Sequence, residues 1–243
     1  LDFATDVEAA VEYLLSRSEF SKTQIGLAGH SEGGLIAPIV TARNEDVSFM
    51  ILLAGPGVNG LEIQKQQVET FGPSMGLSEE LIKIEQQNLV EMAAITRNNK
   101  VGPELENALI QFFNDKLGEI EEVQGMPKDD FIKLQIPNLN RNWNKYFIDH
   151  EPSEYLSKID VPTLAISGEK DIQVTSVNLE FIERAFTDKS IITVKEYPGM
   201  NHFFQECNSC LMSEYAQIEE TFSEYVMQDI SEWIHSKTDS HQN

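Results

Sequence analysis

The sequence predicts an α/β fold: a mostly parallel sheet with crossover helices, interrupted by a helical insertion. Three observations lead to this prediction. Apolar runs of strand length alternate with amphipathic helices in the first part of the chain, and the same alternation returns in the last part. Between them lies a long stretch with helical patterns only. Alternating strands and helices are typical of parallel sheets, because each parallel strand needs a crossover connection.

The first part of the chain is predicted to contain helix, strand, helix and strand. A capping box that starts at Thr5 and apolar residues at helical spacing predict a helix over residues 6–17. The apolar runs over residues 23–29 and 47–55 have the length and composition of buried parallel strands. Residues 31–43, between these strands, have the pattern of a helix.

The middle of the chain is predicted to be a helical insertion without a clear strand. Candidate helices cover residues 78–96, 105–117 and 128–134, and the first of them opens with two glutamates at its positive end. An insertion of this kind between sheet strands indicates a cap or lid. The predicted segments are a core with residues 1–57, a helical cap with residues 58–155 and a core with residues 156–243.

The last part of the chain returns to strands and helices. Strands are predicted over residues 163–168 and 191–197, with a helix over residues 177–185 between them. A second capping box, at Thr221, precedes a final helix with an apolar face that includes Val226. The predicted sheet therefore has about four strands. One of its edges is uncovered, and because such an edge can pair with another chain, a homodimer through it is a hypothesis.

Composition excludes several classes of function. The chain carries 40 acidic and 18 basic side chains, for a net charge of −22. Nucleic acid is therefore not an expected partner, since phosphate binding needs a basic surface. No apolar run approaches the roughly 18–20 residues that a membrane-spanning helix requires, so no membrane span is expected. The chain begins at Leu1 without a visible signal peptide, and the sequence indicates no compartment.

The main chemical motif is Gly29-His30-Ser31-Glu32-Gly33, which lies between a predicted strand and a predicted helix. That context is typical of a nucleophile elbow, in which small residues at both glycine positions let neighbouring backbone pass closely. Ser31 is then the nucleophile, and the backbone N–H of Glu32 donates to the oxyanion. The simpler interpretations are a helix-capping Ser31 and a Glu32 carboxylate stabilised by the helix dipole. A pocket-facing Glu32 would instead pair with a substrate amine. His30 is expected to pack beneath the elbow.

A serine nucleophile needs a base and a group that orients the base. In chain order, Asp171 follows the strand over residues 163–168, and His202 follows the strand over residues 191–197. Both lie at carboxyl ends of predicted parallel strands, where sheets of this kind bind ligands. Glu169 is the rival acid, and the alternative for both catalytic candidates is a purely structural loop position.

These motifs resemble those of the α/β-hydrolase superfamily, in particular bacterial carboxylesterases grouped with serine aminopeptidase-like hydrolases. The shared segments are Gly29-His30-Ser31-Glu32-Gly33-Gly34, Gly168-Glu169-Lys170-Asp171-Ile172-Gln173-Val174 and Asn201-His202-Phe203-Phe204-Gln205. The resemblance implies an acyl-enzyme mechanism with Ser31 as nucleophile, His202 as base and Asp171 as the orienting acid. Superfamily members have several strands before the elbow, so N-terminal strands and a second oxyanion donor are expected to be missing from this C-terminal portion.

The expected activity is hydrolysis of a small-molecule carboxylic ester or amide, with ester cleavage favoured and no cofactor or metal. An aminopeptidase or amidase, or an acyltransferase, would use the same three residues. A hypothesis from another class is a non-catalytic fragment with an incomplete oxyanion hole. The substrate-binding residues cannot be specified from the sequence.

The two cysteines, Cys207 and Cys210, are open to three interpretations. Zinc would need about two more ligands of suitable type, and His202 is already assigned to catalysis. A local disulfide is possible at this spacing. We favour two free thiols, with the disulfide as the main alternative.

Overall fold

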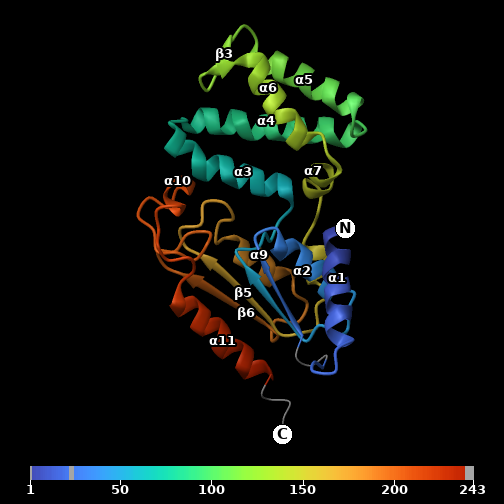
Figure 1. The fold of residues 1–243 in the computed structure, drawn as a ribbon. Helices are drawn as coiled ribbons and strands as arrows, with labels where there is room; N and C mark the ends of the chain where they lie inside the picture. Colours follow the sequence, from blue (N-terminus) through green and yellow to red (C-terminus); the bar gives the residue numbers. More distant parts are fainter. Residues whose placement is uncertain (1, 22–24, 239–243) are drawn as a thin grey trace. The chain divides into compact units, whose positions relative to one another are not determined.

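The chain is described by a computed structural model at residues 2–21 and 25–238 (Figure 1). It divides into two compact units, and a four-stranded parallel sheet forms the centre of the first, which comprises the described residues up to Val58 and from Glu151 onward. The strand order is β1-β2-β5-β6, and each neighbouring pair is parallel. The strands are β1 (Gly26–His30), β2 (Phe49–Leu53), β5 (Thr163–Gly168) and β6 (Ile192–Tyr197). The predicted parallel sheet is therefore confirmed. Residues 23 and 24 of the predicted first strand lie outside the described residues.

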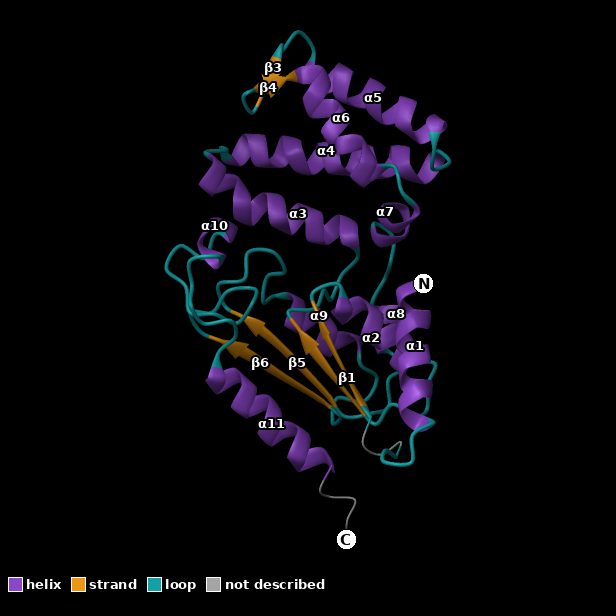
Figure 2. Ribbon diagram, in the orientation of Figure 1, coloured by secondary structure: helices purple, strands orange, loops and turns teal. Residues whose placement is uncertain are grey.

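Both faces of the sheet are buried, which explains why its central strands are continuous apolar runs. Met50 and Leu52 of β2 point to a cluster completed by Ile182 of helix α9 (Asn178–Ala185). The intervening Ile51 points to the opposite cluster, with Val226 of helix α11 (Glu224–Thr238). Figure 2 shows these helices on the two sides of the strands. Alternation along β2 thus divides the core into two layers.

The other helices of this unit comprise two that were predicted, with displaced ends, and two short ones that were not predicted. They are α1 (Asp2–Leu15), α2 (Gly33–Thr41), α8 (Ser153–Leu156) and α10 (Met212–Tyr215). The prediction that Thr5 caps the first helix is wrong, because Thr5 lies inside α1 and its hydroxyl donates to the carbonyl of Asp2 at 2.6 Å. The predicted cap at Thr221 is also misplaced, since α11 begins at Glu224.

A polar cluster joins β6 to α11. The hydroxyl of Tyr197, a fully buried side chain, donates to Asp229 Oδ2 at 2.8 Å, and Lys195 donates to the same oxygen. The ammonium group of Lys195 holds the pKa of Asp229 below its usual range. Asp229 therefore satisfies the only polar atom of a tyrosine side chain in the core.

Replacement of Asp229 by alanine is expected to lower the free energy of unfolding by about 1–3 kcal/mol, the cost of leaving a buried hydroxyl unpaired. Urea denaturation measures this change. Glu232→Ala on the same helix is the control, since Glu232 is exposed and, among the described residues, bonds Gln228 alone. An equal effect of the two substitutions would contradict the assignment.

The second compact unit, Asn59–His150, is mostly helical. Its elements are α3 (Gly60–Phe71), the 3₁₀ helix η2 (Gly72–Met75), α4 (Glu79–Asn98), α5 (Pro103–Leu117), β3 (Glu122–Val123), β4 (Met126–Pro127), α6 (Lys128–Leu139) and α7 (Asn142–Phe147). The three predicted helices are present, and Ser78 caps α4 by accepting from Leu81 N–H at 3.3 Å. The role of this unit as a cap stays a prediction.

Several features of this unit were not predicted, among them the helices α3, η2 and α7. The insertion was expected to contain no clear strand, but β3 and β4 form an antiparallel hairpin. Its turn residues, Gln124 and Gly125, both have positive φ, as a tight hairpin turn requires. Helix α6 also continues past its predicted end at residue 134, through Pro137, because Ile136 packs in the core of the unit.

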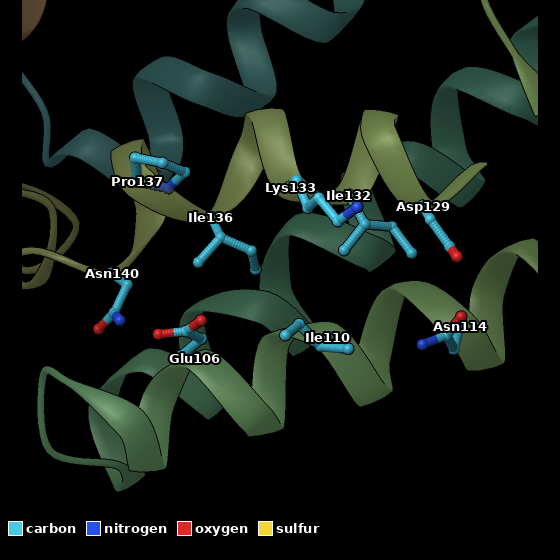
Figure 3. Close-up of a pocket in the computed structure, with 9 residues that line it drawn as sticks. All are labelled: Glu106, Ile110, Asn114, Asp129, Ile132, Lys133, Ile136, Pro137 and Asn140. Atoms are coloured by element: carbon cyan, nitrogen blue, oxygen red, sulfur yellow. The ribbon is translucent and has the colours of Figure 1, made fainter. Parts of the chain in front are cut away.

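A cavity of about 360 Å³ lies between α5 and α6 (Figure 3). Its lining includes the apolar side chains of Ile110, Ile132 and Ile136 and the carboxylates of Glu106 and Asp129. No predicted catalytic residue lines it. In the described ranges, no helix is both long enough and apolar enough to cross a membrane.

Candidate active site

Ser31 occupies a tight turn between β1 and α2. Its φ is 54°, in the left-handed region that residues with a side chain adopt at a cost. The Ser31 N–H donates to the carbonyl of Leu53 at 2.9 Å, and the Gly34 N–H donates to the carbonyl of Ser31 at 2.8 Å. Hydrogen bonds to the neighbouring strand and within the turn therefore hold the serine in this conformation.

The glycines around Ser31 have different structural roles. A Cβ atom on Gly29 would lie 2.1 Å from the carbonyl oxygen of Gly33, and one on Gly34 would lie 2.6 Å from the Cα of Gly55. A Cβ atom on Gly33 would meet nothing within 4 Å. The expectation that both motif glycines are required for close approach is thus wrong for Gly33, where only the backbone takes part in the contact. Gly34, outside the pentapeptide, is the second tightly packed position.

Asp171 and His202 form a buried pair. His202 Nδ1 lies 2.7 Å from Asp171 Oδ2, and their side chains are 4% and 0% exposed. Because an ionised carboxylate can only accept, Nδ1 carries the proton and Nε2 is left as the basic atom. The other carboxylate oxygen accepts the N–H groups of Gln173 at 2.8 Å and Val174 at 2.9 Å. Three hydrogen bonds therefore hold the Asp171 carboxylate in place, and one of them orients the imidazole ring.

The rival acid, Glu169, has other partners. Its carboxylate accepts the Gly199 N–H at 3.0 Å and pairs with Lys170 at 3.0 Å, and these contacts hold the pKa of Glu169 below its usual value. Since the hydrogen bond of the His202 ring goes to Asp171, the geometry favours Asp171 over Glu169 as the orienting acid.

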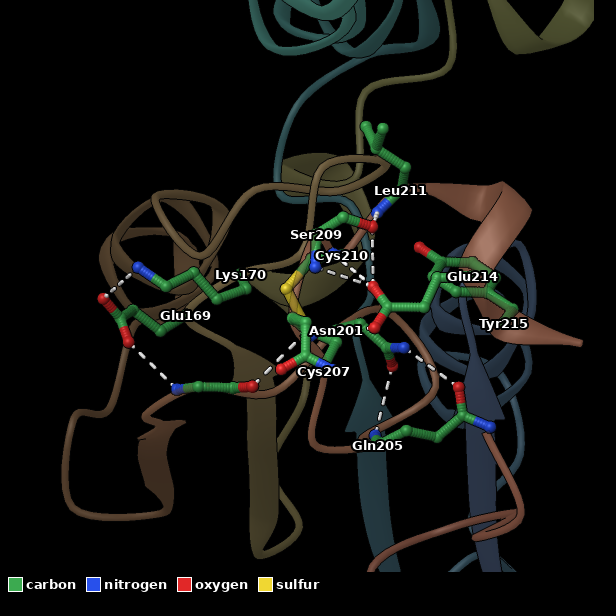
Figure 4. Close-up of a disulfide and its surroundings, with 12 residues drawn as sticks. Glu169, Lys170, Asn201, Gln205, Cys207, Ser209, Cys210, Leu211, Glu214 and Tyr215 are labelled. Carbon is green, nitrogen blue, oxygen red and sulfur yellow. Dashed lines mark hydrogen bonds and ion pairs between the residues drawn. A yellow bond between two sulfur atoms is a disulfide. The ribbon is translucent and has the colours of Figure 1, made fainter. Parts of the chain in front are cut away.

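Asn201 shapes the loop that carries His202. This side chain is 0% exposed, and its Oδ1 accepts the N–H groups of Phe203 at 2.9 Å and Gln205 at 3.1 Å. Its Nδ2 donates to Gln205 Oε1 at 2.9 Å (Figure 4). Sequence reasoning placed Asn201 in a shared motif without giving it a role. Asparagine directly before the histidine is the available signal, because its side chain commonly bonds backbone two residues ahead.

His30 lies against His202, with ring centroids 4.6 Å apart. His30 Nε2 is 2.9 Å from the carbonyl oxygen of His202, and because a carbonyl can only accept, this nitrogen donates. Burial lowers the pKa of His30, so the ring is neutral at pH 7. The residue before Ser31 is therefore bonded to the backbone of His202, a more specific position than the packing beneath the elbow that we predicted.

Ser31 is connected to the Asp171–His202 pair through the contact between the preceding residue, His30, and His202, and not through a direct hydrogen bond. Within the described part of the chain, the Ser31 side chain makes no hydrogen bond to His202. Catalytic hydrogen bonds are often long before substrate binds, so this geometry is compatible with a serine and its base. Glu32 is exposed and stands at the start of α2 with helical φ and ψ.

Cys207 and Cys210 are joined by a disulfide. The favoured prediction of two free thiols is therefore wrong. The loop between them turns back through a positive φ at Cys210, and the two Cα atoms are 5.0 Å apart, within the range that a disulfide spans. Across residues 2–21 and 25–238, no group of three His, Cys, Asp or Glu side chains is arranged to hold a metal ion.

Comparisons with known proteins agree with this fold. Residues 7–126 match the family model described as BAAT / Acyl-CoA thioester hydrolase C terminal. The α/β-hydrolase GrgF from Penicillium sp. sh18 is similar in structure, with 11% identity and a TM-score of 0.54 over 97% of this chain and 71% of that chain. No curated protein sequence matches at a significant level.

Two further solved structures are similar at lower TM-scores. A monoacylglycerol lipase of Paleococcus ferrophilus has 14% identity and a TM-score of 0.48, covering 96% of this chain and 74% of that one. Est1E from Butyrivibrio proteoclasticus has 14% identity and a TM-score of 0.47, covering 96% and 69%.

The parallel sheet, the strand-to-helix turn at Ser31 and the pair at the ends of β5 and β6 define an α/β-hydrolase fold. The chain therefore has the α/β-hydrolase fold that the resemblance in its sequence implied.

Proposed function

We propose that this chain is a serine hydrolase that cleaves small carboxylic esters, and less readily amides, through an acyl-enzyme intermediate. The observation that carries the proposal is the buried hydrogen bond of 2.7 Å between Asp171 and His202. A buried carboxylate beside a histidine fixes the tautomer and the orientation of the ring. The left-handed turn at Ser31 supports the same proposal, because it is the backbone state of a nucleophile elbow.

In the proposed mechanism, Ser31 Oγ attacks the carbonyl carbon while His202 Nε2 accepts the hydroxyl proton. The charge that develops on the substrate oxygen is stabilised by the backbone N–H of Glu32, at the positive end of α2. When the C–O bond of the ester breaks, His202 returns the proton to the leaving alcohol. Water then attacks the acyl-enzyme with His202 again as base, which releases the acid and restores Ser31.

Asp171 orients the ring and stabilises the imidazolium formed in each step, without itself becoming protonated. Its carboxylate is suited to this role because two backbone N–H groups, of Gln173 and Val174, hold the oxygen that does not face His202. The geometry around Asp171 is therefore preorganised before substrate arrives.

Thioester hydrolysis is a second candidate, favoured by the match of residues 7–126 to a family model named for acyl-CoA thioester hydrolases. A thioester carbonyl passes through the same acyl-enzyme intermediate, with a thiolate as leaving group. Rates on a butyrate ester, a butyryl thioester and an amino-acyl anilide distinguish esterase, thioesterase and peptidase. Faster hydrolysis of the anilide than of both the ester and the thioester would contradict the proposal that the chain is an esterase.

Covalent labelling with a fluorophosphonate probe tests the proposal directly. We expect phosphonylation at Ser31, located by mass spectrometry, and its loss in Ser31→Ala and His202→Ala. Labelling at another serine, or no labelling of the folded wild-type chain, would overturn the assignment of the nucleophile. The second outcome would favour the non-catalytic hypothesis, because a missing oxyanion donor slows reaction by about 10²–10³.

A further inference from the structure

The loop closed by the disulfide is held by one carboxylate. Glu214 Oε2 accepts the N–H groups of Ser209 and Cys210, both at 2.8 Å, and the Ser209 hydroxyl at 2.7 Å. Its Oε1 accepts the Asn208 N–H at 2.9 Å. Figure 4 shows this carboxylate directed into the loop beside the sulfur atoms. Three backbone donors in one turn form an anion-binding nest, and its ligand here is a side chain of the same protein.

Glu214 thereby fixes helix α10 (Met212–Tyr215) to the disulfide loop. The Ser209 hydroxyl and the backbone donors lower the pKa of Glu214 to about 2, so the carboxylate is ionised at every pH near neutrality. Hydrogen bonds to an ionised acceptor are about twice as strong as neutral ones. The next residue in α10 is Tyr215, whose position therefore depends on this anchor.

Tyr215 contacts two residues, Phe203 and Gln173, that lie just after His202 and Asp171 in the sequence. Its ring packs edge-on against Phe203, with centroids 5.2 Å apart, and Phe203 directly follows His202. Its hydroxyl accepts from Gln173 Nε2 at 3.4 Å, and the backbone N–H of Gln173 is one of the two that hold Asp171. Burial raises the pKa of Tyr215, and the charge of Asp171 acts in the same direction, so the hydroxyl stays neutral.

We propose that Tyr215 is a positioning residue for the Asp171–His202 pair, and that the disulfide loop holds it in place through Glu214. Tyr215 has no part in the mechanism above, since neither substrate nor a reacting atom contacts it there. It contacts the neighbours of both members of the pair and restricts their movement. The expected effect on the reaction rate at Ser31 rests on the proposed hydrolase function. The expected effect on the Asp171–His202 hydrogen bond does not.

The disulfide gives this support a redox dependence. A dithiol reductant converts the Cys207–Cys210 disulfide into two thiols while its own two sulfurs form a disulfide, which balances two electrons and two protons. The open loop then has more freedom, because a covalent closure no longer restricts residues 207–210. The donors around Glu214 lose their fixed geometry, and Tyr215 loses its anchor.

Two measurements on the full chain test the proposal. The first is the rate of fluorophosphonate labelling at Ser31. The second is the rate at which the His202 Nδ1 proton exchanges with water, followed by its downfield NMR resonance. This rate reports the Asp171–His202 hydrogen bond whether or not the protein is catalytic. Tyr215→Ala is expected to slow labelling on the order of tenfold, since small misplacements of catalytic groups have large effects on rate. The same variant should exchange the Nδ1 proton faster.

Tyr225→Ala is the matched control, because Tyr225 is an exposed tyrosine on α11 whose ring packs on Tyr197. It should label and exchange as the wild type does. Tyr215→Phe keeps the ring on Phe203 and should lie between the wild type and Tyr215→Ala. Dithiol treatment and Glu214→Gln, which weaken the anchor without changing Tyr215, should move both readouts in the direction of Tyr215→Ala.

If Tyr215→Ala folds and shows the proton-exchange and labelling rates of the wild type, the positioning role of Tyr215 is overturned. Wild-type behaviour of the dithiol-treated protein would overturn the role of the disulfide loop. If the wild type does not label at Ser31 but Tyr215→Ala still accelerates exchange of the His202 proton, the hydrolase proposal fails and the positioning of the pair by Tyr215 stands.

Discussion

Replacing Asp171 by asparagine is expected to lower kcat for ester hydrolysis by about 10⁴-fold, the effect typical of an orienting acid in a serine hydrolase. An amide at this position can offer its N–H₂ to His202 Nδ1, which would place the ring proton on Nε2. The base would then have no lone pair facing Ser31. The measurement is steady-state hydrolysis of a butyrate ester, with the fold checked by circular dichroism.

Glu169→Gln is the matched control for this substitution. Glu169 lies close to Asp171 in the chain, and its carboxylate accepts a hydrogen bond from Gly199 rather than from His202. Glutamine keeps an acceptor oxygen for that bond, so we expect less than about a tenfold loss of kcat. If Glu169→Gln were the more damaging change, the acid would be Glu169 and the role of Asp171 would be structural.

Chain order predicted that an acid and His202 would lie close together, because of how parallel sheets are built, whereas the choice of Asp171 over Glu169 rested on the family resemblance. Two adjacent parallel strands, β5 and β6, end at the same edge of the sheet. Residues that follow them, Asp171 and His202, must therefore lie near one another. The hydrophobic runs were also informative, since β5 is buried along its whole length. The limits of several predicted elements were displaced, because hydrogen bonding rather than apolarity decides where a strand or helix ends.

Contacts from distant loops could not be predicted in the same way. Tyr215 contacts Phe203 and Gln173, and the preceding residue, Glu214, bonds a loop that a disulfide closes. No periodicity or spacing in the sequence encodes that geometry. The hairpin of β3 and β4 was missed for a different reason: each strand has two residues, too few to show alternation.

Gly29→Ala is expected to destabilise the chain by about 1–3 kcal/mol and to abolish labelling at Ser31. The added Cβ would lie 2.1 Å from the carbonyl oxygen of Gly33, which is backbone and cannot rotate away. Relief of this clash would require the turn to open, and the left-handed conformation of Ser31 would be lost with it. Thermal unfolding and fluorophosphonate labelling measure the two effects.

Gly33→Ala distinguishes this explanation from a general intolerance of the motif. The sequence motif alone treats the two glycines as equivalent, whereas the space around them differs, since a Cβ on Gly33 meets nothing within 4 Å. Gly33 is also the first residue of α2, where alanine restricts the unfolded chain and favours the helix, so stability should stay equal or rise by about 0.4–1 kcal/mol. Comparable destabilisation by both substitutions would mean that the turn depends on backbone freedom at Gly33 rather than on the close approach at Gly29.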